Sequence, residues 1–379
     1  PEDPPGGVMF GAPDPEEAAR RVVSGESWTE FCDMLKMAGS IIEQSPADPQ
    51  TRAEGLRYLS RLTRVALETF VEHADPKAPV LMRVVHETAE IGNDNPDNVY
   101  YNAAVSGAFT YRLSGTRGSV HWLEFATQKG QYGEGRGMPP TGRLDGVDLT
   151  VDDRGRFEVV LSVEDPGPGV DWLRMEPDTG TLIIRQSWLD RSTEVLPELT
   201  LERIGGDGRP TAFTAPAMDH GLRRSAMLVG GAARIFAGWV DGFQNHVNAL
   251  PRFDQALSNQ MGGVADIVYH HSYWRLADDE ALVIESDAFP CDHWNFQLSN
   301  HFMESLDYRY DTIHTNSKIA MPSEDGRIRL VVAGPDPGVP NWLTTQGHGF
   351  GAMCFRWVRP EGAPPIPTCR VVPLAELAR

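Results

Sequence analysis

Cysteines and long apolar runs are scarce in this 379-residue chain. The four cysteines, Cys32, Cys291, Cys354 and Cys369, lie far apart and form no Cys-x-x-Cys pair. That spacing argues against a zinc knuckle and against a disulfide-stapled secreted domain, and it favours free thiols in a reducing cytosol. No run approaches the roughly 18 apolar residues of a membrane-spanning helix, so we expect no membrane partner and a cytoplasmic location.

Basic patches and phosphate-binding loops are also missing. The net charge is −19, and no stripe of lysine and arginine is present, which excludes a nucleic-acid partner that is held through its phosphates. The sequence lacks the GxxxxGK[ST] loop, a strand–GxGxxG–helix fingerprint and the GxSxG elbow. We therefore predict no flavin, nicotinamide or nucleotide and assign no cofactor.

Turn residues are abundant instead, with 37 glycines and 29 prolines. Apolar residues at helical spacing predict a helical segment over residues 1–92, which includes a capped start at Asp14 and Pro15, and a helical connection over residues 216–263. Short β-branched and aromatic runs between turns predict β modules over residues 93–215 and 264–379. We expect a mainly β protein with helices (α+β), built from antiparallel β-sandwich or jelly-roll-like modules.

The two β modules repeat each other at a nearly constant spacing. Five pairs of anchors lie 170 to 172 residues apart: Gly155 and Gly326, Asp165 and Asp336, Trp172 and Trp342, His121 and His293, and Tyr101 and Tyr273. Each unit of about 100 residues has the size of a β-sandwich rather than of a solenoid repeat. This pattern predicts an internal duplication, in which Trp172 and Trp342 occupy equivalent places.

The same segments resemble a bacterial family called domain of unknown function 1214. The resemblance is carried by residues 94–101 (DNPDNVYY) and 111–118 (YRLSGTRG) of the first module, and by Trp294, Leu306 to Tyr308, Asp325 to Gly326 and Asn341 to Leu343 of the second. It covers most of residues 25–360. It implies antiparallel β-sandwich or jelly-roll modules with accessory helices, and it implies no activity.

Histidines gather in the second module, since seven of the eleven fall from His246 onward. Carboxylates and aromatic residues lie among them. The pattern fits three interpretations: an acid–base site, a metal site, or core hydrogen bonds. Metal sites on sheets favour His-x-His, whose alternate residues share one face, and the sequence contains none, so we assign no metal ligand.

The acid–base interpretation gives specific candidates. The proposed catalytic residues are His293, His301, Glu304 and Asp307. The proposed substrate-binding residues are Tyr273, Trp294, Tyr308, Asn245 and His246. A histidine beside a carboxylate can serve as a general base, and a desolvated glutamate can serve as the acid.

Three functions are consistent with this sequence. The first is a non-redox hydrolase, lyase or isomerase that acts on a small, largely apolar or aromatic molecule. The second is a non-catalytic protein that binds a lipid, glycan or aromatic ligand. The third is an assembly protein, for which the arginine-lined helix over residues 48–73 would be the surface for a homo-oligomer. A closed pocket with convergent polar groups would favour the enzyme, and an open aromatic groove would favour the binder.

Overall fold

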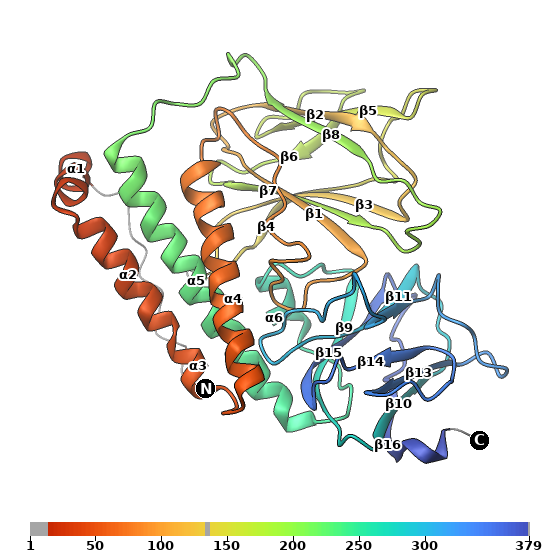
Figure 1. Cartoon of the computed structure of the whole chain (residues 1–379). Helices are drawn as coiled ribbons and strands as arrows, with labels where there is room; N and C mark the ends of the chain where they lie inside the picture. The colour runs from red at the N-terminus through yellow and green to blue at the C-terminus, as the bar shows by residue number, and fades with distance from the viewer. Residues whose placement is uncertain (1–13, 133–136, 378–379) are drawn as a thin grey trace.

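A computed structural model describes residues 14–132 and 137–377. Helices lie along one side of two β modules (Figure 1). The helices are α1 (Pro15–Ser24), α2 (Glu26–Ala38), α3 (Ser40–Gln44), α4 (Pro49–Leu67), the π-helix η1 (Glu68–Glu72), α5 (Ala215–Phe243), the 3₁₀ helix η2 (Gln244–His246), α6 (Gln255–Gln260) and the 3₁₀ helix η3 (Leu374–Glu376). Among the described residues, none of these helices is both long and apolar enough to cross a membrane.

The first module contains eight strands in two sheets. They are β1 (Asn98–Ala104), β2 (Tyr111–Thr116), β3 (Trp122–Gln128), β4 (Pro140–Asp145), β5 (Arg156–Ser162), β6 (Asp171–Arg174), β7 (Thr181–Ser187) and β8 (Glu198–Arg203). One sheet has the order β1-β7-β3-β4 and the other β6-β5-β2-β8. Apolar residues of both sheets share one core, which includes Leu113, Phe125 and Ile184.

The second module repeats this topology strand for strand. It contains β9 (Ile267–Arg275), β10 (Glu280–Ser286), β11 (His293–Leu298), β12 (His314–Asn316), β13 (Ile328–Ala333), β14 (Trp342–Thr344), β15 (Phe350–Val358) and β16 (Thr368–Pro373). Its sheets have the orders β9-β15-β11-β12 and β14-β13-β10-β16. The predicted pair of related β-sandwich modules with helices is therefore confirmed, while the narrower description as a jelly roll stays a prediction.

Strand register fixes the offset between the modules at 171 residues for the central strands. Trp122 pairs with Ser187 as His293 pairs with Val358, and 293 − 122 and 358 − 187 are both 171. Trp172 and Trp342 are equivalent as predicted. Their indole Nε1–H groups donate to the main-chain oxygens of Ser162 (3.1 Å) and Ala333 (3.0 Å), at the same point of a parallel strand pair in each module.

Two predicted anchors are wrong by this register. The equivalent of His293 is Trp122 and not His121. The equivalent of Tyr101 is His270 and not Tyr273, because Tyr101 pairs with Ile184 as His270 pairs with Phe355. A slip of one residue along a strand moves a side chain to the other face of the sheet, so these residue matches were coincidences of sequence.

The helical layer covers the outer face of the second module's β9–β15–β11–β12 sheet. Asp14 caps α1, since its carboxylate accepts from the backbone N–H of Glu16, and Pro15 follows at the first helical position, as predicted. A shared core joins Leu62 of α4 and Phe236 of α5 to Tyr273 and Ala352 of that sheet. The predicted helical connection contains α5, η2 and α6, with a non-helical stretch at residues 247–254 that includes Pro251.

The polar segment of residues 93–97 runs between the two modules. The main-chain N–H of Asn93 donates to Met303 (2.8 Å), and the side chain of Asn295 on β11 donates to Asn95 and Asp97 (3.2 Å each). The outer faces of the two sheets and this segment form the module junction. The candidate site lies there.

Candidate ligand-binding site at the module junction

A cavity of about 240 Å³ lies between the modules and beside α5. Seven aromatic side chains contribute to its walls: Phe70, Tyr100, Trp122, Tyr132, Phe236, Trp239 and Tyr269. These residues come from both sheets, from α5 and from the helical segment. A cavity of about 150 Å³ can hold benzene, so the space suits one aromatic ring with a small substituent.

Arg356 of β15 is the buried cation of this cavity. Its side chain lines the cavity, and only 3% of the residue is exposed. Nη1 donates to Asn295 Oδ1 (3.2 Å) and Gln297 Oε1 (2.5 Å), and Nη2 donates to the main-chain oxygen of Asn93 (2.5 Å). All three acceptors are uncharged. A guanidinium has five N–H donors, so one on Nε and one on Nη2 make no hydrogen bond within the described residues.

Asp94 is the one acidic residue among the described cavity walls. Its carboxylate accepts from the N–H (3.1 Å) and the hydroxyl (3.0 Å) of Ser305. Burial raises the pKa of Asp94 to about 6, although the Ser305 hydrogen bonds and the positive charge of Arg356 act in the opposite direction. Near neutral pH this carboxyl group can therefore exchange a proton.

His271 of β9 is a neutral imidazole in the same walls. It is stacked between Phe243 and Tyr269, with ring centroids 5.6 and 5.3 Å away. Burial, followed by repulsion from Arg356, lowers the pKa of His271 well below its ordinary value. The amide of Asn93 lies 3.1 Å from Nδ1, and Nε2 makes no hydrogen bond within the described residues. The imidazole can therefore offer Nε2–H to a ligand.

Polar atoms without partners border the cavity. The side-chain oxygens of Asn93, Gln128 and Gln131 and the indole nitrogen of Trp122 are buried and make no hydrogen bond within the described residues. All four residues belong to the walls. A buried polar group without a partner costs about 1–3 kcal/mol, so their gathering at one cavity indicates a polar or hydrated occupant.

The charge balance of the walls is positive. Three arginines, Arg185, Arg224 and Arg356, face one acid, Asp94. Arg185 is neutralised by Glu124, whose carboxylate lies 2.8 Å from its Nη1. Arg224 lies over the ring of Phe70, with 4.3 Å between the guanidinium carbon and the ring centroid. Arg356 is therefore the cation best placed to attract an anionic group.

The structure does not bring the four predicted catalytic residues into one pocket. His293 is buried at the junction and bonds Asp292, whereas His301 bonds the hydroxyl of Tyr273 (2.9 Å) under the helices. Glu304 is buried against Arg61 of α4 (2.7 Å). Asp307 pairs with Arg309 (2.6 Å). None of the four belongs to the described walls of the cavity.

Glu304 forms a buried charge cluster. Arg61 lies between Glu304 and Glu90 (2.9 Å), so one cation serves two buried carboxylates. Burial raises the pKa of Glu304, and burial together with nearby carboxylates raises the pKa of Glu90 to about 10. The pair therefore retains a proton at neutral pH. It joins α4 to the second module and is structural by its contacts.

The predicted substrate-binding residues are also dispersed. Trp294 belongs to the core of the second module, and Tyr273 belongs to the core beneath the helices. Tyr308 lies under the guanidinium of Arg191, at 5.0 Å. Asn245 and His246 are exposed on η2. None of the five belongs to the described walls.

The sequence contains two signals for this site that we did not use. Arg356 is the one charged residue in the otherwise buried strand Phe350–Val358. A lone cation in a strand of that kind is rarely buried without a function. The second signal is the polar run of residues 93–98, which precedes β1 and carries part of the family resemblance.

The fold and the cavity define a two-module β-sandwich protein with a helical layer and a polar, positively charged cavity at the module junction. The solved structure of an uncharacterized protein from Burkholderia cenocepacia is 47% identical to this chain, covers 94% of it and 99% of its own length, and superposes with a TM-score of 0.91. The chain belongs to the same family as that protein.

A solved protein from Vibrio parahaemolyticus is 11% identical, with a TM-score of 0.49, over 84% of this chain and 98% of that one. No family model matches the sequence, and no curated protein matches it either.

Proposed function

We propose that the protein binds a small aromatic or apolar carboxylate in the cavity at the module junction. The observation that carries this proposal is Arg356, a buried guanidinium whose protein acceptors are all uncharged and which keeps two N–H donors for a ligand. A buried charge without an opposite charge in direct contact is costly, and a bidentate carboxylate would compensate it.

The aromatic walls account for the rest of the ligand. A single ring would fill much of the 240 Å³ and would be surrounded by Trp239, Tyr132 and Phe236. Ring–ring contacts of this kind contribute about 0.5–1.5 kcal/mol beyond the area that they bury. The proposed ligand is therefore a compact arylcarboxylate rather than a lipid or a glycan.

Catalysis is the second candidate, favoured by Asp94. Its raised pKa of about 6 would let it donate or accept a proton near neutral pH, and His271 would stabilise developing negative charge through Nε2–H. This is the acid–base enzyme expected from the sequence, with different residues. Membership of the domain of unknown function 1214 family likewise stays a prediction.

The test compares a carboxylate with its uncharged amide. Phenylacetate and phenylacetamide share the ring and differ in charge, and calorimetry would measure both affinities. We expect phenylacetate to bind more tightly. The variant R356K should lose about 10- to 100-fold in phenylacetate affinity, because it keeps the charge but not the two-pronged donor.

The matched control is R370K, since Arg370 is exposed on β16, away from the cavity. It should bind as the unaltered protein does. Circular dichroism and thermal unfolding would establish that R356K is folded. Equal affinity for acid and amide, or unchanged affinity in folded R356K, would overturn the proposal.

A further inference from the structure

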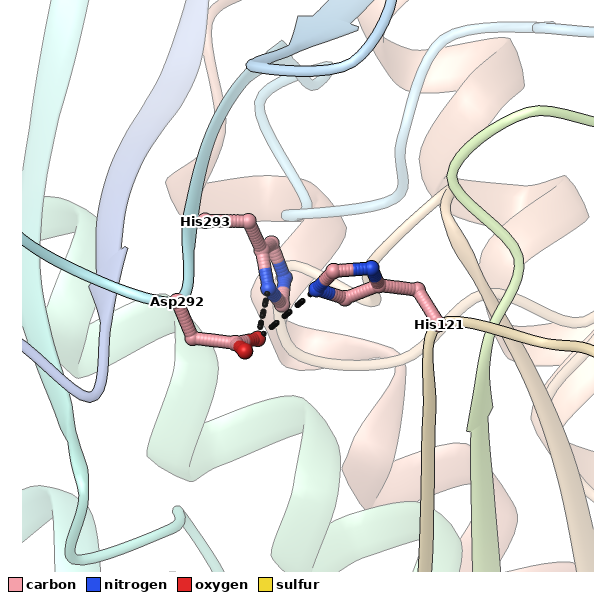
Figure 2. A group of neighbouring side chains, drawn as sticks. All are labelled: His121, Asp292 and His293. Carbon is pink, nitrogen blue, oxygen red and sulfur yellow. Dashed lines mark hydrogen bonds and ion pairs between the residues drawn. The ribbon is translucent and has the colours of Figure 1, made fainter.

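Three potential metal ligands from both modules meet outside the cavity walls. His121 lies immediately before β3 in the first module, Asp292 lies before β11 in the second, and His293 is the first residue of β11. Figure 2 shows the two imidazoles converging on one carboxylate. The sequence analysis missed this group because it looked for two histidines within one strand.

The distances within the group are short. Asp292 Oδ2 lies 3.0 Å from His121 Nε2 and 2.8 Å from His293 Nδ1. One ligand atom from each residue lies within 4.8 Å of the others. The histidine rings meet edge to face, with centroids 5.3 Å apart.

These spacings are close to those around a tetrahedral zinc ion. Zinc binds imidazole nitrogen and carboxylate oxygen at about 2.0–2.2 Å, so neighbouring ligand atoms lie roughly 3.3 Å apart. Movements of a few tenths of an ångström would admit the ion. Two histidines and one carboxylate also form a three-ligand set that leaves positions for water.

Burial gives the group a fixed side and an accessible side. His293 is 1% exposed, whereas the side chains of His121 and Asp292 are 32% and 31% exposed. The buried ligand is held by strand pairing with Val358, and the accessible ligands provide a path for the ion. Glu194 adds negative charge, since it accepts from the His121 N–H (3.4 Å), and Lys318 opposes it.

We propose that His121, Asp292 and His293 form a binding site for a divalent transition metal of the zinc class, which clamps the two modules together. Because the ligands belong to different modules, the ion binds only when the junction is assembled. Binding should therefore stabilise the folded protein as its concentration exceeds the dissociation constant. The proposal is independent of the carboxylate site.

The test uses the full chain, freed of metal by a chelator and titrated with Zn²⁺ by calorimetry. We expect one site per chain and a rise in the unfolding temperature. H121A and D292N should each weaken Zn²⁺ binding by about 100-fold or more, since even loss of an outer-shell partner costs 10- to 100-fold. Co²⁺ should show visible absorption that both variants lose.

H246A is the matched control, because His246 is an exposed histidine on η2. It should keep the affinity and the thermal shift of the unaltered protein. His121 is exposed, so H121A should fold, and circular dichroism would check this. Zn²⁺ affinity unchanged in folded H121A, equal losses in H246A, or binding without a rise in unfolding temperature would each overturn the proposal.

Discussion

Asp94 shows how one buried residue couples the cavity to pH. Its pKa of about 6 lies above the model value of 3.8, chiefly because the site is buried. The folded protein therefore holds this proton more tightly than the unfolded chain does. The resulting stabilisation is fully present below about pH 4 and is lost as the pH rises through about 6.

The variant D94N tests that assignment. A shift of about two pKa units corresponds to roughly 3 kcal/mol of unfolding free energy between pH 4 and pH 7. We expect the unaltered protein to lose about this much more stability over that interval than D94N, as measured by urea unfolding. The comparison across pH cancels the constant cost of the altered hydrogen bonds to Ser305.

Asp336 is exposed in a turn of the second module and provides the control. D336N should keep the pH dependence of the unaltered protein. If D94N also keeps it, Asp94 titrates in the ordinary range and its proposed role in proton exchange fails.

At the scale of elements, the paired strands β5–β6 and β13–β14 carry the clearest mark of duplication. Each pair holds a tryptophan whose indole bonds the main chain of its neighbouring strand. W172F and W342F should each cost about 1 kcal/mol of stability, the usual value of one hydrogen bond, and the two costs should add because the sites lie in different modules.

Chemical unfolding of the two single variants and the double variant would measure these costs. A cost in one module but not in the other would show that the two indoles, though equivalent in position, differ in energetic role. A strongly non-additive double variant would show that the modules do not respond independently at these positions.

Sequence predicted these elements well because turn residues and strand periodicity are local. Gly155 and Gly326, with φ of 73° and 75°, mark equivalent turns that only a few residue types adopt easily. The matches at Tyr101 and His121 failed because sequence alone does not fix strand register to within one residue.

The candidate site was predicted poorly for a physical reason. Its groups come from the segment of residues 93–97, from β9 and from β15, which only the assembled junction brings together. The predicted residues Trp294 and Glu304 were chosen for their place in one polar stretch, yet one belongs to a core and the other to a buried ion pair. Composition located the correct module but not the correct face.

At the scale of the whole molecule, both proposed sites lie where the two modules meet. The carboxylate site uses Arg356 of the second module and Tyr100 of the first, and the metal site uses His293 and His121 in the same way. Duplication supplied two similar outer sheet faces. Polar substitutions on those faces then provided the ligand-binding groups.

The most direct test of the account is a crystal structure of the full chain with phenylacetate. We predict the ring between Trp239 and Tyr132 and the carboxylate about 2.7–2.9 Å from the nitrogens of Arg356. An occupied cavity with the carboxylate turned away from Arg356, or an arylcarboxylate bound only elsewhere on the protein, would contradict it.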